Sequence, residues 1–145
     1  MNIPVVGFGS AMYHMAYQLT DRFGVVVAND KTMPELVRKI KSMGCYDRMV
    51  SMIPLNIPIE EAYKDEIESK FVEIGRYQID EQGANLIAAG HATMLATIGF
   101  GSRESIEQKL GVPVLEPPGI GIKTLEVLVD LKLTHSKKAY PSPTE

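Results

Sequence analysis

The sequence has no tryptophan, four phenylalanines and a single cysteine, Cys45. A lone cysteine cannot form an internal disulfide, which favours a reducing, cytoplasmic setting. No apolar run approaches the roughly 20 residues that a membrane-spanning helix needs, and the N-terminus lacks the basic and apolar regions of a secretory signal. The formal net charge is only −3, so composition gives no electrostatic reason to expect binding to nucleic acid or membranes.

The composition is typical of one soluble globular domain. A chain of 145 residues, 45% of them apolar, can fill one core and is too short for two ordinary domains. Because aromatic residues are few, aliphatic side chains and eight methionines must form that core. We expect an ordered domain over residues 1–133 and a polar, proline-containing tail over residues 134–145.

Apolar runs typical of buried strands alternate along the chain with segments of helical periodicity. This alternation predicts an α/β fold with a single open, mostly parallel five-stranded sheet and helices on both faces, of flavodoxin-like or Rossmann-like type. Strand orders 3-2-1-4-5 and 2-1-3-4-5 both remain open. The expected strands are residues 3–7, 25–28, 48–55, 85–89 and 112–115; the expected helices are 11–20, 60–82, 102–110, 120–133 and one from a capping box at 32–35 to Gly44.

Two glycine-containing turns, Gly7-Phe8-Gly9-Ser10 and Gly90-His91-Ala92-Thr93, each follow an expected strand and open a helical segment. In an open α/β sheet, ligands bind beyond the carboxyl ends of the strands, where the strand order reverses. The glycines of the first turn are explained equally well by a tight turn that needs them for its own geometry. Backbone N–H groups at helix starts hold carboxylate or phosphate, so the predicted substrate-binding residues are Gly9, Ser10, Ala92 and Thr93.

The first turn does not complete a dinucleotide-binding fingerprint. Met12 stands where the third glycine of G-x-G-x-x-G belongs, which makes a Rossmann cofactor a weak interpretation. Three well-separated histidines and one cysteine also do not match the spacing of metal ligands. We therefore expect neither a cofactor nor a metal.

His91 is the ionisable side chain of the two turns. An imidazole near neutrality can take a proton from an acidic C–H bond or return it, so His91 is the predicted catalytic residue. A histidine that merely satisfies a helix terminus is an equally open interpretation. His14 is expected to pack or face a groove, and His135 to be solvated in the tail. Glu116, after the last expected strand, either supports the site or is an exposed loop carboxylate.

Four segments carry a resemblance to a known family: Ile3–Ala16, Asp30–Pro34, Leu110–Leu115 and Leu133–Pro141. In this order they resemble the second lobe and C-terminal tail of the aspartate/glutamate/hydantoin racemase superfamily, and the hydantoin racemases most of all. The resemblance implies one lobe of an enzyme that has two similar α/β lobes with the active site between them. Such enzymes use two cysteines, one per lobe, as acid and base on opposite faces of the substrate α-carbon.

The chain departs from the family pattern at the reacting position. The family's second cysteine lies in a Gly-Cys-x-x-Met context, and the corresponding residues here are Gly90-His91-Ala92-Thr93-Met94. The first lobe and its cysteine have no counterpart, because Met1 falls where the second lobe begins. The resemblance implies cofactor-independent proton transfer at a carbon next to a carbonyl, in a hydantoin-like, amino-acid-like or other small carboxylate substrate.

Two other interpretations stay open: a non-catalytic domain that binds a small anion or docks on a partner, and an incomplete piece of a longer racemase. In the family the last helix and tail pack on the first lobe, so the helix expected at 120–133 would lack that partner here. A self-sufficient domain buries the apolar face of this helix, whereas an orphaned fragment exposes it and associates. We expect a homo-oligomer or association through this helix.

Overall fold

The computed structural model describes residues 3–58, 63–98 and 102–141. Four parallel strands, β1 (Phe23–Val27), β2 (Met49–Pro54), β3 (Ile87–Ala89) and β4 (Val114–Leu115), form one sheet in the order β2-β1-β3-β4. The predicted α/β class, with a parallel sheet between helices, is confirmed. The sheet has four strands in the described part of the chain, and not the predicted five.

The missing strand is the first one predicted. Residues 3–7 are extended but pair with none of the described strands, and the Ile3 and Val5 side chains are 61% and 70% exposed. A five-residue apolar run carries no information about its partner, so periodicity could not reveal this. As a result β1 pairs directly with β3, and neither predicted five-strand order applies.

Six α-helices are described: α1 (Phe8–Leu19), α2 (Met33–Ser42), α3 (Lys64–Asp80), α4 (Ala92–Ile98), α5 (Ser102–Leu110) and α6 (Pro117–Asp130); two short 3-10 helices span Asp30–Thr32 and Tyr46–Arg48. The glycines predicted to end α2, α3 and α5 have positive φ angles, at Gly44, Gly83 and Gly111. The capping box predicted at the start of α2 is wrong, because the Thr32 hydroxyl donates to the Asn29 carbonyl instead of capping the helix.

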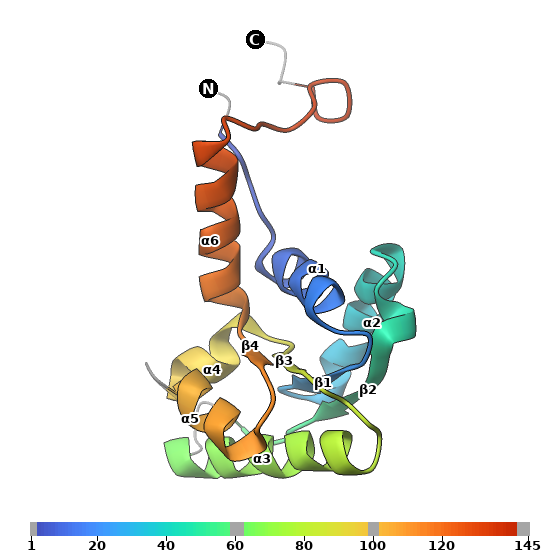
Figure 1. Ribbon diagram of the computed structural model, residues 1–145, viewed down its shortest axis with the longest axis vertical. Coiled ribbons are helices and arrows are strands. Elements are labelled where there is room, and N and C mark those ends of the chain that lie inside the picture. The colour runs from blue at the N-terminus through green and yellow to red at the C-terminus, as the bar shows by residue number, and fades with distance from the viewer. Residues whose placement is uncertain (1–2, 59–62, 99–101, 142–145) are drawn as a thin grey trace.

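The helices cover both faces of the sheet (Figure 1). Helices α1 and α2 pack on the face of Val25 and Val27, and helices α3, α4 and α5 pack on the face of Val26. All five residues of β1 are buried, which identifies it as the centre of the core. The largest fully buried side chains of the two layers include Tyr13, Phe23 and Met12 on the first face, and Phe71, Ile67 and Ile106 on the second.

Helix α6 stands partly away from this core. Its first turns pack on α1, where Gly121 lies against the Phe8 ring, and its later turns rise above the sheet beside the N-terminal segment (Figure 1). In these later turns Val127, Val129 and Leu131 are 53%, 60% and 64% exposed. The apolar face of the last helix is therefore only partly buried within the chain.

Candidate functional site

His91 is positioned by the pairing of β1 with β3. Val26 lies opposite Ala89 in the register of these two parallel strands, so two residues further on Ala28 lies opposite His91. The Ala28 N–H donates a hydrogen bond to Nδ1 of His91, with 3.2 Å between the two nitrogens. Burial lowers the pKa of the half-buried imidazole below its ordinary value, so the ring is neutral at pH 7.

Gly90 allows the end of β3 to approach β1 closely enough for His91 to reach the Ala28 N–H. A Cβ atom on Gly90 would lie 2.6 Å from Cγ1 of Val27 and 3.3 Å from the Val26 carbonyl oxygen. The Gly90 N–H donates to that same carbonyl at 2.8 Å. Because only glycine leaves this space empty, residue 90 fixes the distance at which His91 reaches Ala28.

A cavity of about 730 Å³ lies next to this contact, lined by residues 28–32, residues 56–58, His91 and Thr93. These residues directly follow β1, β2 and β3, so the cavity lies beyond the carboxyl ends of three parallel strands. From β1 the chain crosses to β2 on one side and returns to β3 on the other. The cavity therefore occupies the switch point at which open α/β sheets bind ligands.

Two cavity residues, Asn29 and Asn56, are not among the site residues predicted from the sequence. Asn29 has a buried Oδ1 atom with no hydrogen-bond partner among the residues described. Asn56 adopts a left-handed φ of 51°, and its Oδ1 accepts a hydrogen bond from the Asp30 N–H at 3.2 Å. The signal that could have found them is their place directly beyond apolar strands, where binding loops gather.

The structure brings only some of the predicted site residues together. Ala92 begins α4 beside His91, and Thr93 lines the cavity. Gly9 and Ser10 lie in the first turn of α1 and are not among the residues that line it. Gly9 also has no positive φ, so it is not a glycine required by a tight turn. The substrate-binding roles of these four residues stay predictions.

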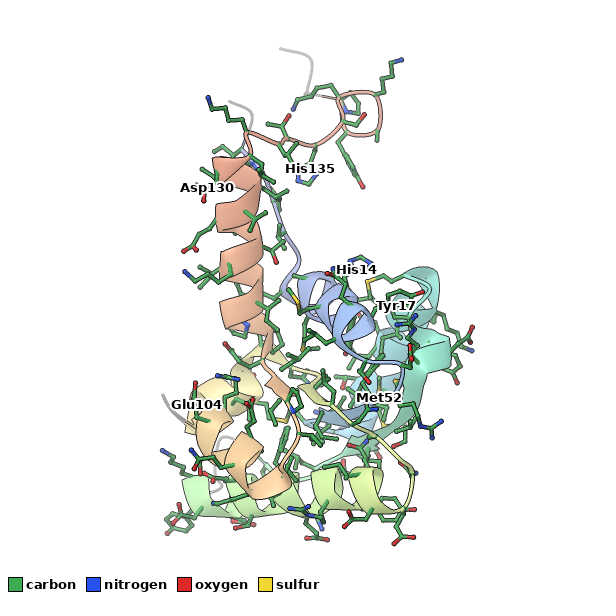
Figure 2. The ribbon with its side chains drawn as sticks, viewed as in Figure 1. His14, Tyr17, Met52, Glu104, Asp130 and His135 are labelled. Carbon is green, nitrogen blue, oxygen red and sulfur yellow. The ribbon has the colours of Figure 1, made fainter. Side chains whose placement is uncertain are left out.

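The other singled-out side chains do not line this cavity. His14, expected to pack or face a groove, is exposed on α1. His135, predicted to be solvated, is instead half-buried, with Nε2 2.9 Å from both the nitrogen and the oxygen of Val5, so it ties the tail to the N-terminal segment. Figure 2 shows His14 on α1 and His135 beyond the end of α6. Glu116 caps α6 by accepting the Gly119 N–H at 2.9 Å.

Within the described ranges, no three histidine, cysteine or acidic residues gather in a way that could hold a metal ion. No helix of these ranges is long and apolar enough to cross a membrane. Cys45 is buried, and burial raises the pKa of its thiol. A thiol in that position is held as the unreactive neutral form.

The lowered pKa of His91 predicts a pH-dependent stability. The unfolded imidazole binds protons below about pH 6.5, whereas the folded one binds them only at lower pH. The contribution of His91 to the free energy of unfolding is therefore fully present above pH 6.5. It falls as the pH drops from 6.5 toward the lower pKa of the folded state. Urea unfolding at pH 7.5 and 5.5 should show this loss, and a smaller loss in His91→Asn. An equal loss in both proteins would assign it to other groups.

Comparison with known proteins agrees with the geometry. The sequence model of the Asp/Glu/hydantoin racemase family matches residues 1–125. The chain belongs to this family. It is 30% identical to a hydantoin racemase of Paenarthrobacter aurescens over 98% of its own length, and 29% identical to one of Pseudomonas sp. (strain NS671) over 97%.

Solved racemase structures share the fold. An allantoin racemase from Pseudomonas fluorescens superposes on the whole chain with a TM-score of 0.86 at 28% identity, and one from Klebsiella pneumoniae superposes on 92% of it with a TM-score of 0.82 at 25% identity. The chain spans 59% and 55% of the two hydantoin racemases, and 61% and 54% of the two allantoin racemases. The racemase-family resemblance predicted from the sequence is confirmed.

Proposed function

We propose that this chain forms one half of a cofactor-independent racemase active site, with His91 as its catalytic residue. The reaction is proton transfer at a carbon next to a carbonyl, in a hydantoin-like or amino-acid-like substrate. The observation that carries the proposal is the position of His91, which is hydrogen-bonded across the switch point to Ala28 and lines the cavity there. The names of the similar proteins support the substrate class.

The remaining predicted residues fit this proposal in different ways. Ala92 and Thr93 begin the helix that follows His91, and Thr93 lines the same cavity as the imidazole. Gly9 and Ser10 would bind the substrate only if it extends past the cavity toward α1. Racemisation also needs a second group on the opposite face of the carbon, and one lobe supplies one face. The domain boundary at residue 133 and the cytoplasmic setting stay part of the prediction.

Proton exchange in D2O tests this function directly. We expect the native chain to exchange the α-proton of single enantiomers of 5-substituted hydantoins, followed by proton NMR, with aspartate and glutamate as alternative substrates. His91→Ala should slow this exchange by about 10²-fold or more, the least effect expected from removing either a positioned acid or base or a hydrogen-bond donor to the transition state. Circular dichroism of His91→Ala controls for folding. We expect a native spectrum, because a half-buried side chain at a strand end contributes little to the core.

The outcomes separate the candidate functions. Equal exchange in the native chain and in His91→Ala would remove His91 from the mechanism. No exchange with any of these substrates would contradict catalysis by this chain and favour a second candidate, a docking domain. That candidate is supported by the exposed side chains of Val127 and Leu131, which are four residues apart and so lie on one side of α6 and its C-cap. They form an apolar surface suited to association with a second copy.

A further inference from the structure

The tautomer of His91 follows from its hydrogen bond. Nδ1 accepts the Ala28 N–H, so Nδ1 carries a lone pair and no proton. A neutral imidazole has one N–H, which must then be on Nε2. Nε2 is also the nitrogen that Ala28 does not engage, and the ring lines the cavity. The backbone N–H of Ala28, directly after β1, thus determines which nitrogen of the imidazole a ligand meets.

This tautomer restricts the chemistry of the ring. To remove a proton through Nε2, His91 needs a lone pair there and a proton on Nδ1, and that proton would point at the Ala28 N–H. An imidazolium acid also needs a proton on Nδ1 and meets the same conflict. Loss of the Nε2 proton from the neutral ring leaves an imidazolate anion, which partial burial disfavours. A hydrogen bond donated by Nε2 is compatible with the geometry as it stands.

We infer that His91 acts as a neutral hydrogen-bond donor, whose Nε2–H binds the oxygen of the carbonyl next to the reacting carbon. A neutral imidazole in this role polarises a carbonyl and stabilises the enolate that forms when the neighbouring C–H bond breaks. The electron pair of that bond moves toward the oxygen held by His91, and the proton goes to another group. The inference rests on the proposed function for its ligand, and its structural part stands on the Ala28 contact alone.

The charged residues that line the cavity do not oppose the neutral Nε2–H form of His91. Asp30 and Lys31, both exposed, are the charged side chains among the described residues of the lining. They come from the short 3-10 helix after β1 (Asp30–Thr32). The lining residues after β2 are Asn56, Ile57 and Pro58, and Thr93 lies on α4. Asp30 is the lining carboxylate that can receive the substrate proton, a role that Asp30→Asn would remove.

Nitrogen NMR of the native chain tests the inference. In uniformly ¹⁵N-labelled protein at pH 7.0, long-range ¹H–¹⁵N correlations should show His91 as the neutral Nε2–H tautomer, with its signals assigned by their loss in His91→Ala. Addition of hydantoin should shift the Nε2 signal and leave Nδ1 in place. His91→Gln, whose amide can still donate but cannot carry a proton, should bind hydantoin within about twofold of the native chain. His91→Ala should bind it roughly 3- to 10-fold more weakly.

The results distinguish this inference from the proposed function. An Nδ1–H tautomer, an imidazolium at pH 7.0, or binding by His91→Gln as weak as that of His91→Ala would overturn the donor role and leave proton exchange by the chain unaffected. The expected tautomer and binding, together with no exchange of any substrate proton, would overturn the proposed function and leave the donor role in place.

Discussion

Gly90→Ala is expected to lower the free energy of unfolding by about 1–3 kcal/mol, the usual cost of overpacking a filled core. The added methyl group would lie 2.6 Å from Cγ1 of Val27 and 3.2 Å from Cγ1 of Val25. Both neighbours are buried β-branched residues whose χ1 rotation is restricted, so the strand ends must separate to make room. For a chain of this size each kcal/mol lowers the melting temperature by about 2–4 °C.

The same substitution should disturb the site. Moving the end of β3 away from β1 lengthens the bond between the Ala28 N–H and His91 Nδ1, which a change in the Ala28 amide chemical shift would report. Gly9→Ala is the matched control, because a Cβ there meets only the flexible Lys39 amine at 3.4 Å and the Tyr13 ring at 3.9 Å. Alanine is favoured over glycine in a helix, so the control should be at least as stable as the native chain. A Gly90→Ala protein with native stability would show that the end of β3 accommodates a Cβ atom at residue 90 without strain.

The fold was predictable where local chemistry determines the structure. The amphipathic periods of α2 and α3 and the left-handed glycines that follow them depend on neighbouring residues, and both were found. The segment 3–7 shows the limit. Its apolar residues suit a strand, but a strand also needs a partner, and partners are chosen by the packing of distant elements. Without that information an extended, exposed segment and a buried strand look alike.

The site was predictable to a similar extent. His91 stood out because it follows an apolar run and begins a helix, and the structure places it at the switch point. The residues opposite it were not singled out from the sequence: residues 28–32 line the cavity, and the turn at 7–10 does not. That difference follows from the strand count, since a sheet that included residues 3–7 would bring the first turn to the same edge. The contact with Ala28 depends on strand register, which periodicity cannot supply.

Leu131→Lys is expected to weaken self-association of the chain, if α6 forms the contact between two copies. Leu131 is 64% exposed at the end of α6, and burial of a leucine side chain contributes about 1.5–3 kcal/mol. Replacement with a charged residue in both copies should therefore raise the dimer dissociation constant by roughly tenfold or more. A lysine at a helix C-terminus interacts favourably with the helix dipole, so the substitution should not destabilise α6 itself.

Asp130→Asn is the matched control, because it also raises the net charge by one at the neighbouring exposed residue (Figure 2) and removes no apolar surface. Sedimentation velocity over a concentration series should show the native chain and Asp130→Asn associating alike and Leu131→Lys shifted toward the monomer. Equal association of all three would place the contact away from Leu131. A native chain that stays monomeric at every concentration would exclude a second copy as the partner.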